Sequence, residues 1–259
     1  MARTDCPWQP EHGASGELVI RRGTAGWFRF RWPRFALLLC DRLFRINVMC
    51  HHYIAFKTGN IDPRWVDEFN IRTDLKQIAT SPISGVYPLS HVPVIRPGNE
   101  GNRELVTCEW GLLPRWWKPT AKAPKRQGYQ RHCFNARSET VADKPSFREA
   151  FKRRRCLMPA SAFFERGHYF ALNDDRPFAF AGLWERWGEG EEIVESCTLI
   201  TTEPNAEVRS VGHDRMPVLL TSEDEYARWL DREVIEYERL EPLLRTFPDD
   251  QLNCYKAKK

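Results

Sequence analysis

The regular part of this sequence begins only after the dipeptide Met49-Cys50. Residues 1–48 lack a sustained helical or strand period, whereas the residues after Cys50 form short apolar runs separated by Gly and Pro breaks. With 259 residues, 42% of them apolar, the chain can bury a full core as one large domain or as one domain with an appendage. We therefore expect the folded domain in residues 49–259 and an N-terminal extension in residues 1–48.

The extension carries the formal charge of the whole protein. It contains 8 Arg, no Lys and 4 acidic residues, so its net charge of 8 − 4 = +4 equals that of the full chain and leaves the rest formally neutral. The presence of Arg without Lys indicates an effect of the nucleotide composition of the coding DNA rather than selection for positive charge. We therefore expect residues 1–48 to lie upstream of the true start or to be removed, and a basic arm that binds nucleic acid is the alternative.

Composition also sets the expected class of protein. No apolar run approaches the about 20 residues that span a bilayer, and we expect no cleavable signal peptide. The 8 cysteines include no CxxC pair and no zinc-finger spacing. We expect a soluble cytoplasmic protein with reduced thiols, no membrane association, no cofactor and no metal. A metal site from His51, His52 and His91 is weakly supported, because adjacent strand residues point to opposite faces.

Cys50 offers a chemistry that depends on its position in the mature chain. If Met49 is a start residue that is trimmed, Cys50 gains a free α-amine beside its thiol. Such a 1,2-aminothiol condenses with an aldehyde to an imine, and its thiol then closes a thiazolidine ring. The reference pKa values, about 7.7–8.0 for the amine and about 8.5 for the thiol, make both nucleophiles partly available near neutral pH. From this dipeptide alone, a buried internal cysteine is the alternative.

Large aromatic and cationic side chains follow in the middle of the chain. Trp110, Trp116 and Trp117 lie in a segment that Gly and Pro break, beside cationic residues. Bases stack on aromatic rings while cations meet phosphates, so this composition suits a single strand of nucleic acid. Packing of the rings under the loop is an equal alternative. The stretch 118–131 adds lysines and arginines without an acid, which predicts a mobile basic flap.

Four polar side chains stand out in the second half of the chain. Asn135 and Arg137 alternate in a strand-like run, so both are predicted to share one face. Glu165 ends an apolar strand, where a carboxylate is either paired with a cation or has a pKa raised toward proton transfer. His213 comes from a loop just before another strand. Taken singly, Asn135 suits a turn, Glu165 a salt bridge and His213 a satisfied core histidine.

Six motifs, taken together and in order, resemble one family. They are Met49-Cys50, Trp110-Gly111-Leu112-Leu113-Pro114, Asn135-Ala136-Arg137-Ser138-Glu139-Thr140, Arg155-Cys156-Leu157-Met158-Pro159 running to Phe164-Glu165, Gly182-Leu183-Trp184-Glu185, and His213-Asp214-Arg215-Met216-Pro217. They are similar to the motifs of the SRAP (SOS response-associated peptidase) family of abasic-site processing proteins. The resemblance implies an α+β fold, a single domain with a curved, barrel-like mixed β core and flanking helices, that begins at the equivalent of Met49.

The resemblance also implies a function. Such a protein crosslinks itself to abasic sites in single-stranded DNA and shields them during the DNA damage response, with Cys50 bonded to the ring-opened sugar as a thiazolidine. Asn135 would hold the amine or the sugar, Glu165 would shuttle protons, and His213 would assist opening of the sugar ring. AP-lyase activity is chemically accessible from an imine at the sugar carbon.

The same resemblance implies the contacts with DNA and the setting. Arg137 would meet a phosphate, and Trp110, Trp116 and Trp117 would cover or wedge the exposed base stack. The expected partner is single-stranded DNA that contains abasic sites, with the replication machinery as a further candidate. We expect a monomer, associated with the nucleoid if the source is bacterial.

The sequence departs from the family pattern close to two catalytic positions. His51 and His52 stand in place of the usual Gly and Arg after the cysteine, Arg166 in place of the usual Trp after Glu165, and Ala162 in place of a Gly. The change at His52 removes one phosphate-binding guanidinium. Two adjacent histidines can still hydrogen-bond a phosphate, so we expect altered affinity rather than lost function.

Two other classes of function stay open. A cysteine peptidase or autoprotease could use Cys50, His213 and Asn135 as nucleophile, base and orienting amide, and it predicts cleavage at Met49-Cys50 without DNA. A noncovalent single-strand binding module could use the tryptophans and the basic loop. That module predicts salt-sensitive binding that Cys50→Ala leaves unchanged.

Overall fold

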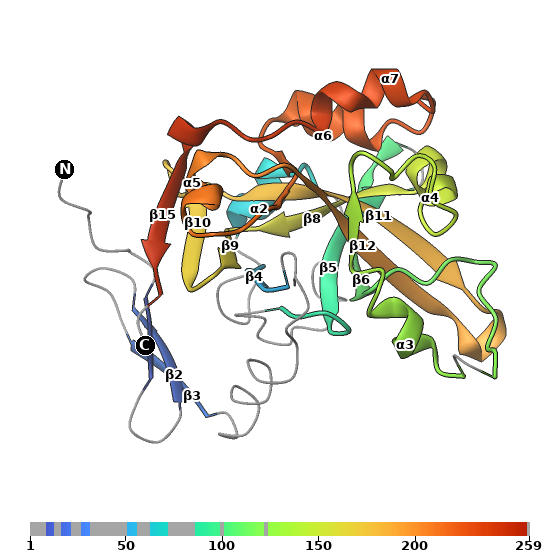
Figure 1. Cartoon of the computed structure of the whole chain (residues 1–259), viewed down its shortest axis with the longest axis horizontal. Helices are drawn as coiled ribbons and strands as arrows, with labels where there is room; N and C mark the ends of the chain where they lie inside the picture. The colour runs from blue at the N-terminus through green and yellow to red at the C-terminus, as the bar shows by residue number, and fades with distance from the viewer. Residues whose placement is uncertain are drawn as a thin grey trace.

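The computed structural model of the chain describes residues 9–12, 17–21, 27–31, 51–55, 63–71, 86–98, 101–121 and 124–257. Met49 and Cys50 lie outside the described residues. The strands form three sheets, and short helices flank them (Figure 1). Within the described ranges, no helix has the length and apolar character needed to cross a bilayer.

The largest sheet closes on itself. Its strands follow the order β13-β12-β6-β5-β8-β11-β14, with β7 beside β12, and a further pairing of β11 with β12 joins the central strands into a barrel. They span β5 (His91–Pro97), β6 (Arg103–Trp110), β7 (Asn135–Arg137), β8 (Arg155–Ala160), β11 (Phe178–Trp187), β12 (Val194–Thr202), β13 (Met216–Pro217) and β14 (Leu219–Leu220). Strand β12 runs parallel to β6 and β7, whereas the pairings of β11 with β8 and β12 are antiparallel. The predicted α+β fold with a curved, barrel-like mixed core is confirmed.

The second sheet continues directly from the barrel. Strand β8 leads through Ser161 into β9 (Ala162–Glu165), which pairs with β4 (Tyr53–Ile54) on one side and β10 (His168–Leu172) on the other. Strand β15 (Leu252–Lys256) completes this sheet beside β10. The sheet therefore brings the start of the expected domain beside the strand that ends in Glu165.

The third sheet belongs to the predicted N-terminal extension. It consists of β1 (Gln9–His12), β2 (Glu17–Arg21) and β3 (Trp27–Arg31), paired antiparallel. The sequence pattern did not predict these strands, because it shows no sustained alternation there. The division of the chain at residue 49 stays a prediction.

The helices are short and lie around the sheets. They are α2 (Pro63–Glu68), α3 (Arg126–Gln130), α4 (Arg148–Arg153), α5 (Ala206–Ser210), α6 (Glu223–Leu230) and α7 (Tyr237–Leu240), with 3-10 turns at Gly190–Glu192, Glu241–Leu243 and Asp249–Gln251. Helix α2 begins at Pro63, a residue that suits the first turn of a helix because its φ is fixed and it lacks an N–H. Asn205 caps α5, because its side chain accepts a hydrogen bond from the amide of Val208 at 3.0 Å.

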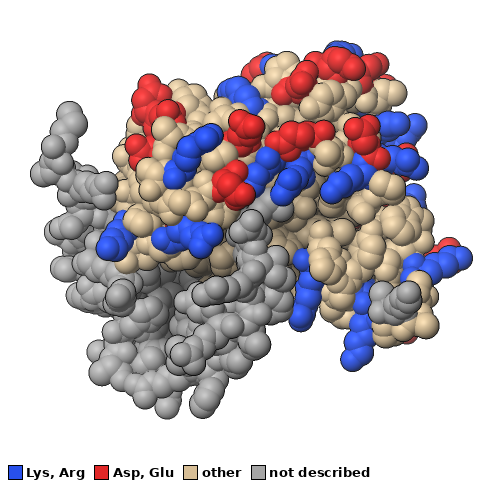
Figure 2. Space-filling view, in the orientation of Figure 1, with Lys and Arg blue, Asp and Glu red and all other residues tan. Residues whose placement is uncertain are grey.

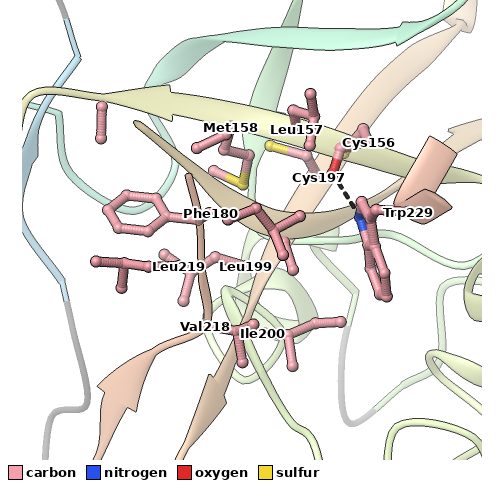
Figure 3. Close-up of a cluster of buried hydrophobic side chains, with 14 of the residues drawn as sticks. Cys156, Leu157, Met158, Phe180, Cys197, Leu199, Ile200, Val218, Leu219 and Trp229 are labelled. Atoms are coloured by element: carbon pink, nitrogen blue, oxygen red, sulfur yellow. Dashed lines mark hydrogen bonds between the residues drawn. The ribbon is translucent and has the colours of Figure 1, made fainter. Parts of the chain in front are cut away.

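Helix α6 covers part of the barrel core. Its buried Tyr226, Trp229 and Leu230 lie three and four positions apart, so they share the face that packs toward β8. The indole Nε1 of Trp229 donates to the carbonyl oxygen of Cys156 at 3.0 Å (Figure 3). Figure 3 also shows apolar side chains from β8, β11, β12 and β14 gathered in the same core. Burial of these groups supplies most of the stabilisation.

Gly182 in β11 provides a test of how tightly this core is packed. A Cβ atom at this position would lie 3.0 Å from Sγ of Cys156 and 3.1 Å from Cγ of Met158. We expect Gly182→Ala to lower the free energy of unfolding by about 1–3 kcal/mol, because the added methyl overpacks a closed interior. Urea denaturation measures the change. Gly128→Ala is the matched control, since a Cβ there meets nothing within 4 Å, and an equal loss in both variants would contradict this packing argument.

Candidate active site

A buried acid and a buried base meet at the end of the second sheet. Oε2 of Glu165 lies 3.1 Å from Nε2 of His213, and the two side chains are 1% and 3% exposed. Glu165 is the last residue of β9, and His213 lies in the loop between α5 and β13. The structure therefore joins two residues that the sequence places far apart, and the Glu165 carboxylate contacts this imidazole.

The hydrogen bonds of His213 determine where its protons lie. Nδ1 is 2.7 Å from the carbonyl oxygen of Arg215, which can only accept, so Nδ1 carries a hydrogen. The backbone amide of Arg215, at 3.3 Å from the same nitrogen, is the weaker contact. With Nδ1 protonated, the contact between Nε2 and Glu165 is a hydrogen bond when one proton lies between the two atoms. The Glu165–His213 pair can therefore share a single proton between Oε2 and Nε2.

The strand pairing of β4 brings the residues that follow Cys50 to this pair. Tyr53 is opposite Phe163 in the register of β4 and β9, and the amide of Phe164 donates to the carbonyl oxygen of His52 at 3.0 Å. Phe164 immediately precedes Glu165 in β9. The described chain at His51 and His52 therefore runs alongside the end of the strand that carries the acid.

His52 occupies an aromatic cluster. Its ring stacks on Tyr87 at 4.6 Å between centroids and an interplanar angle of 11°, with Phe164 tilted at 5.2 Å and Tyr169 edge-on at 6.1 Å. Burial, and secondarily the charge of His51, lower the pKa of His52 to about 4. His52 is thus a neutral imidazole at physiological pH. It does not replace the positive charge of the guanidinium that the family pattern leads one to expect.

The lowered pKa of His52 predicts acid sensitivity of the fold. As the pH falls below about 6.5, the unfolded chain takes up a proton at His52 before the folded chain does, so stability decreases until about pH 4. The loss amounts to at most about 3 kcal/mol. His52→Phe retains the stacking but cannot titrate, so we expect its stability relative to the wild type to increase between pH 7 and pH 4.5. Urea denaturation at both pH values measures this, and an unchanged difference would contradict the assignment.

Strand β7 carries the two polar residues that the sequence predicts on one face. Asn135 is opposite Leu199 of β12 and is 7% exposed, whereas Arg137, opposite Thr201, is exposed. Strand β13 pairs with the same end of β12, with Pro217 opposite Thr201. The segments that carry Asn135 and His213 therefore flank the same end of β12, and Arg137 lies at the protein surface.

The three tryptophans differ in position. Trp116 is 52% exposed, donates its Nε1 to the carbonyl oxygen of Pro145 at 3.1 Å and has the ring of Tyr129 edge-on at 5.9 Å. Trp110 is fully buried, and Trp117 is 5% exposed. A base cannot reach Trp110 or Trp117 in these positions, so the structure corrects the prediction that both cover the base stack. Trp116 remains available as a surface ring.

The segment predicted as a mobile basic flap is partly ordered and partly neutralised. Its residues 126–130 form helix α3, and Arg126 pairs with Glu109 of β6 at 2.5 Å. The segment predicted as a mobile basic flap therefore contains a helix, and the charge of Arg126 in it is paired. In the orientation of Figure 1, acidic side chains concentrate over the half that contains α6 and α7, while Lys and Arg dominate the opposite half of the described surface (Figure 2).

Four buried cysteines of the described chain are poor nucleophiles. Burial raises the pKa of Cys108 to about 12 and that of Cys133 to about 11, and it raises the pKa values of Cys156 and Cys197 well above the ordinary range. A thiol with a raised pKa carries little thiolate at neutral pH. Cys254 is partly exposed. The described part of the chain also holds no cluster of three or more His, Cys, Asp or Glu arranged for a metal.

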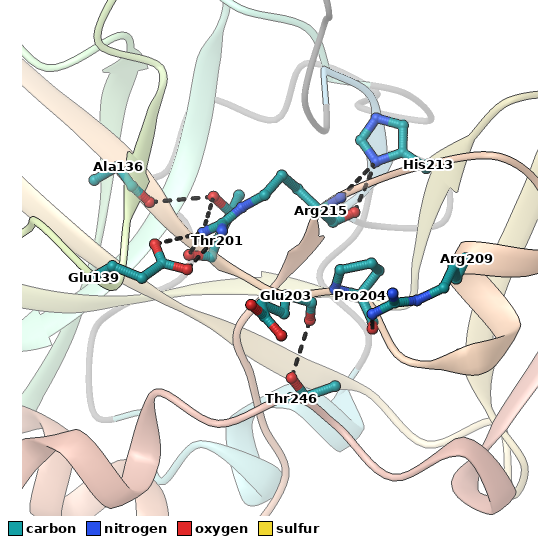
Figure 4. Close-up of polar contacts among 9 residues, drawn as sticks. All are labelled: Ala136, Glu139, Thr201, Glu203, Pro204, Arg209, His213, Arg215 and Thr246. Atoms are coloured by element: carbon teal, nitrogen blue, oxygen red, sulfur yellow. Dashed lines mark hydrogen bonds and ion pairs between the residues drawn. The ribbon is translucent and has the colours of Figure 1, made fainter.

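Two residues of the quoted motifs acquire contacts that the sequence did not reveal. Arg215 forms a two-pronged ion pair with Glu139, with its Nη1 2.6 Å from Oε1 and its Nη2 2.9 Å from Oε2 (Figure 4). The same Nη2 donates to the carbonyl oxygen of Thr201 at 2.6 Å. Glu139 and Arg215 each belong to one of the quoted motifs, which was the only sequence signal that pointed to them. Nothing in the local pattern indicates that they pair.

Comparison with known proteins places residues 49–259 in a match to the family described as SOS response associated peptidase (SRAP). The chain is 35% identical over 203 residues to "Abasic site processing protein YoqW" of Bacillus subtilis, which covers 74% of this chain and 86% of that protein. It is 27% identical over 198 residues to "Abasic site processing protein HMCES" of Gallus gallus, covering 65% of this chain and 57% of the relative.

Solved structures share the fold. A crystal structure of a protein from Bacteroides thetaiotaomicron matches with a TM-score of 0.65 and 22% identity, covering 81% of this chain and 92% of the other. A second, of a protein from Bordetella bronchiseptica, matches with a TM-score of 0.64 and 26% identity, covering 81% of this chain and all of the other. The barrel and the sheet beside it are thus a recurrent architecture.

Proposed function

This chain belongs to the SOS response associated peptidase (SRAP) family, and from that premise we propose that it captures abasic sites in single-stranded DNA as a covalent crosslink through Cys50. The buried Glu165–His213 pair, with Oε2 and Nε2 3.1 Å apart, is the observation that carries the proposal. This pair supplies a proton donor and acceptor at the end of β9. The residues that follow Cys50 lie beside that strand end. Relatives named as abasic site processing proteins support the choice of substrate.

Covalent geometry limits how far the nucleophile can lie from this pair. Cys50 itself lies outside the described residues, but it precedes His52 by two residues. Consecutive Cα atoms are about 3.8 Å apart, so the Cα of Cys50 lies within about 7.6 Å of the Cα of His52. The backbone of His52 is hydrogen-bonded to Phe164, next to Glu165. The proposal requires a sugar held by Cys50 to meet the acid, and this covalent limit is compatible with that requirement.

The proposed reaction forms a thiazolidine and releases one water. The α-amine of Cys50 adds to the aldehyde carbon of the ring-opened sugar, and a proton moves from nitrogen to oxygen to give a carbinolamine. A second proton on that oxygen lets water leave and the imine form. The thiol then adds across the C=N bond, with sulfur joining carbon and hydrogen joining nitrogen. No oxidant or reductant is needed, and both proton transfers are steps that Glu165 can serve.

The remaining residues hold the substrate in this proposal. His213 keeps Glu165 supplied with a proton and assists opening of the sugar ring, and Asn135 binds the amine or the sugar through its amide. Arg137 contacts a phosphate, and Trp116 stacks on a base. The proposed partner is single-stranded DNA with abasic sites, bound by a monomer in the cytoplasm, or at the nucleoid if the source is bacterial, with the replication machinery as a further candidate partner.

The proposed chemistry requires that residues 1–49 be absent from the reacting chain, because an acylated Cys50 amine cannot form an imine. Either translation starts at Met49 and that methionine is then trimmed, or the bond between Met49 and Cys50 is cleaved in the longer chain. Autopeptidase activity of Cys50 is the corresponding proposal, and AP-lyase activity follows from β-elimination at the imine. Both proposed activities depend on Cys50.

Capture of an aldehyde tests the proposed function. We expect the protein that starts at Met49 to form a heat-stable shifted band on a denaturing gel with single-stranded DNA that contains one abasic site. The same DNA with a tetrahydrofuran in place of the abasic sugar lacks the aldehyde and should give no band. Cys50→Ala should also give none. A covalent band with the tetrahydrofuran strand, or no band with the abasic strand, would contradict the proposal and favour a noncovalent binding module or a peptidase.

A further inference from the structure

The guanidinium of Arg215 ties together three segments around the candidate site. Arg215 is 8% exposed, and it makes the two-pronged contact with Glu139 and the contact with the carbonyl oxygen of Thr201 described above (Figure 4). A charge-assisted pair of parallel hydrogen bonds fixes orientation as well as distance. The side chain of Arg215 therefore has one defined position between its partners.

Each partner of Arg215 belongs to a segment that carries or supports a candidate site residue. Glu139 follows β7, the strand of Asn135, and Arg215 follows His213 by two residues. Thr201 lies in β12 between them, opposite Arg137 of β7 and Pro217 of β13. The ion pair thus closes a clamp across the end of β12, with one site residue on each side.

The backbone of Arg215 connects this clamp to the imidazole of His213. Its carbonyl oxygen accepts the hydrogen of His213 Nδ1 at 2.7 Å, so this contact keeps a hydrogen on Nδ1 while Nε2 faces Glu165. A displaced Arg215 carbonyl would free Nδ1 and allow the alternative tautomer. The orientation of the imidazole therefore depends on where Arg215 is held.

We infer that Glu139 is a positioning residue that, through Arg215, fixes the tautomer of His213 and aligns the segments of Asn135 and His213. Its effect on the crosslinking rate rests on the proposed function, whereas its effect on the imidazole does not. Glu139 contacts neither Nδ1 nor Nε2 of His213. It acts by neutralising the charge of the buried Arg215 guanidinium.

The electrostatics of the ion pair support this role. Partial burial acts to raise the pKa of Glu139, but hydrogen bonds and charge from Arg215 outweigh it and lower the pKa. Glu139 is therefore ionised at neutral pH. Removing its charge leaves a buried guanidinium without its counter-ion, a state from which side chains move to find water or another acceptor.

The test uses the full chain labelled with ¹⁵N at histidine. The ring nitrogen shifts of His213, assigned by their loss in His213→Gln, report its tautomer. We expect the Nδ1–H form in the wild type and a mixture of tautomers in Glu139→Gln. Glu149→Gln is the matched control, because Glu149 is an exposed acid of α4 whose nearest cation is 3.9 Å away and also exposed. Unchanged His213 shifts in Glu139→Gln would overturn the inference.

The crosslinking rate gives the second readout and separates the two hypotheses. With the chain starting at Met49, we expect Glu139→Gln to capture an abasic strand about 10-fold to 100-fold more slowly than Glu149→Gln. Equal rates would also overturn the inference. If the wild type forms no crosslink, the proposed function fails and the nitrogen shifts alone decide. Should Glu139→Gln not fold, Glu139→Asp replaces it, since it keeps the charge but is too short to hold both contacts.

Discussion

Glu165→Gln is expected to slow crosslink formation by about 10²-fold to 10⁴-fold, the usual contribution of a positioned general acid or base. Glutamine keeps the size and a hydrogen bond to Nε2 of His213, which lies 3.1 Å from Oε2 in the wild type. It cannot gain or release the shared proton, however. Carbinolamine dehydration then lacks its acid, while binding of the strand is retained.

Single-turnover kinetics measure this effect. Protein in excess is mixed with a single strand containing one abasic site, and the covalent product is followed on denaturing gels. Glu149→Gln serves as the control for loss of a carboxylate elsewhere, because Glu149 is exposed on α4. Noncovalent affinity for the tetrahydrofuran strand should be equal in all three proteins. A Glu165→Gln rate equal to that of the control would show that the buried pair has no part in the chemistry.

Arg155→Met is expected to lower the free energy of unfolding by at least about 3 kcal/mol, because it leaves several buried carbonyl groups without a donor. The guanidinium donates to the carbonyl oxygens of Phe151 at 2.7 Å, Lys152 at 3.1 Å, Trp229 at 2.6 Å and Asp231. These carbonyls lie at the C-terminal ends of α4 and α6, where no intrahelical donor remains. One cation thus caps two helices and holds both against β8.

Chemical denaturation with a matched surface variant tests this assignment. Burial lowers the pKa of Arg155 to about 10, so the side chain is still charged at neutral pH and its removal is a loss of charge as well as of donors. Arg153, two residues earlier, is exposed, and Arg153→Met should change stability by no more than about 0.5 kcal/mol. Similar losses in the two variants would contradict the capping role.

The sequence predicted those features that depend on local pattern. The pattern of apolar residues placed Glu165 at the end of a strand and His213 in a loop before one, as in the structure. Each of these positions is set by the period of a short run and by the breaks around it. The curved, barrel-like core followed from the family resemblance rather than from the pattern.

The local sequence pattern could not predict contacts between segments that are distant in the chain. Glu139 and Arg215 are 76 residues apart, and an acid and a base in two loops carry no sign that they will meet. The tryptophans show the same limit, because the Gly and Pro beside Trp110 indicate a loop but not which side of it faces the core. The Nε1 of Trp110 donates to the carbonyl oxygen of Phe134 at 2.7 Å, a contact between two segments 24 residues apart in the chain.

The most direct test of the central claim is peptide mapping of the crosslinked product by mass spectrometry. The full chain, expressed so that its own start or processing determines the N-terminus, is reacted with an abasic single strand and digested with protease and nuclease. We predict a modified peptide that begins at Cys50 and carries the sugar fragment less one water, with no residue before it. An adduct on a lysine or on another cysteine, or on a Cys50 still joined to Met49, would contradict the account.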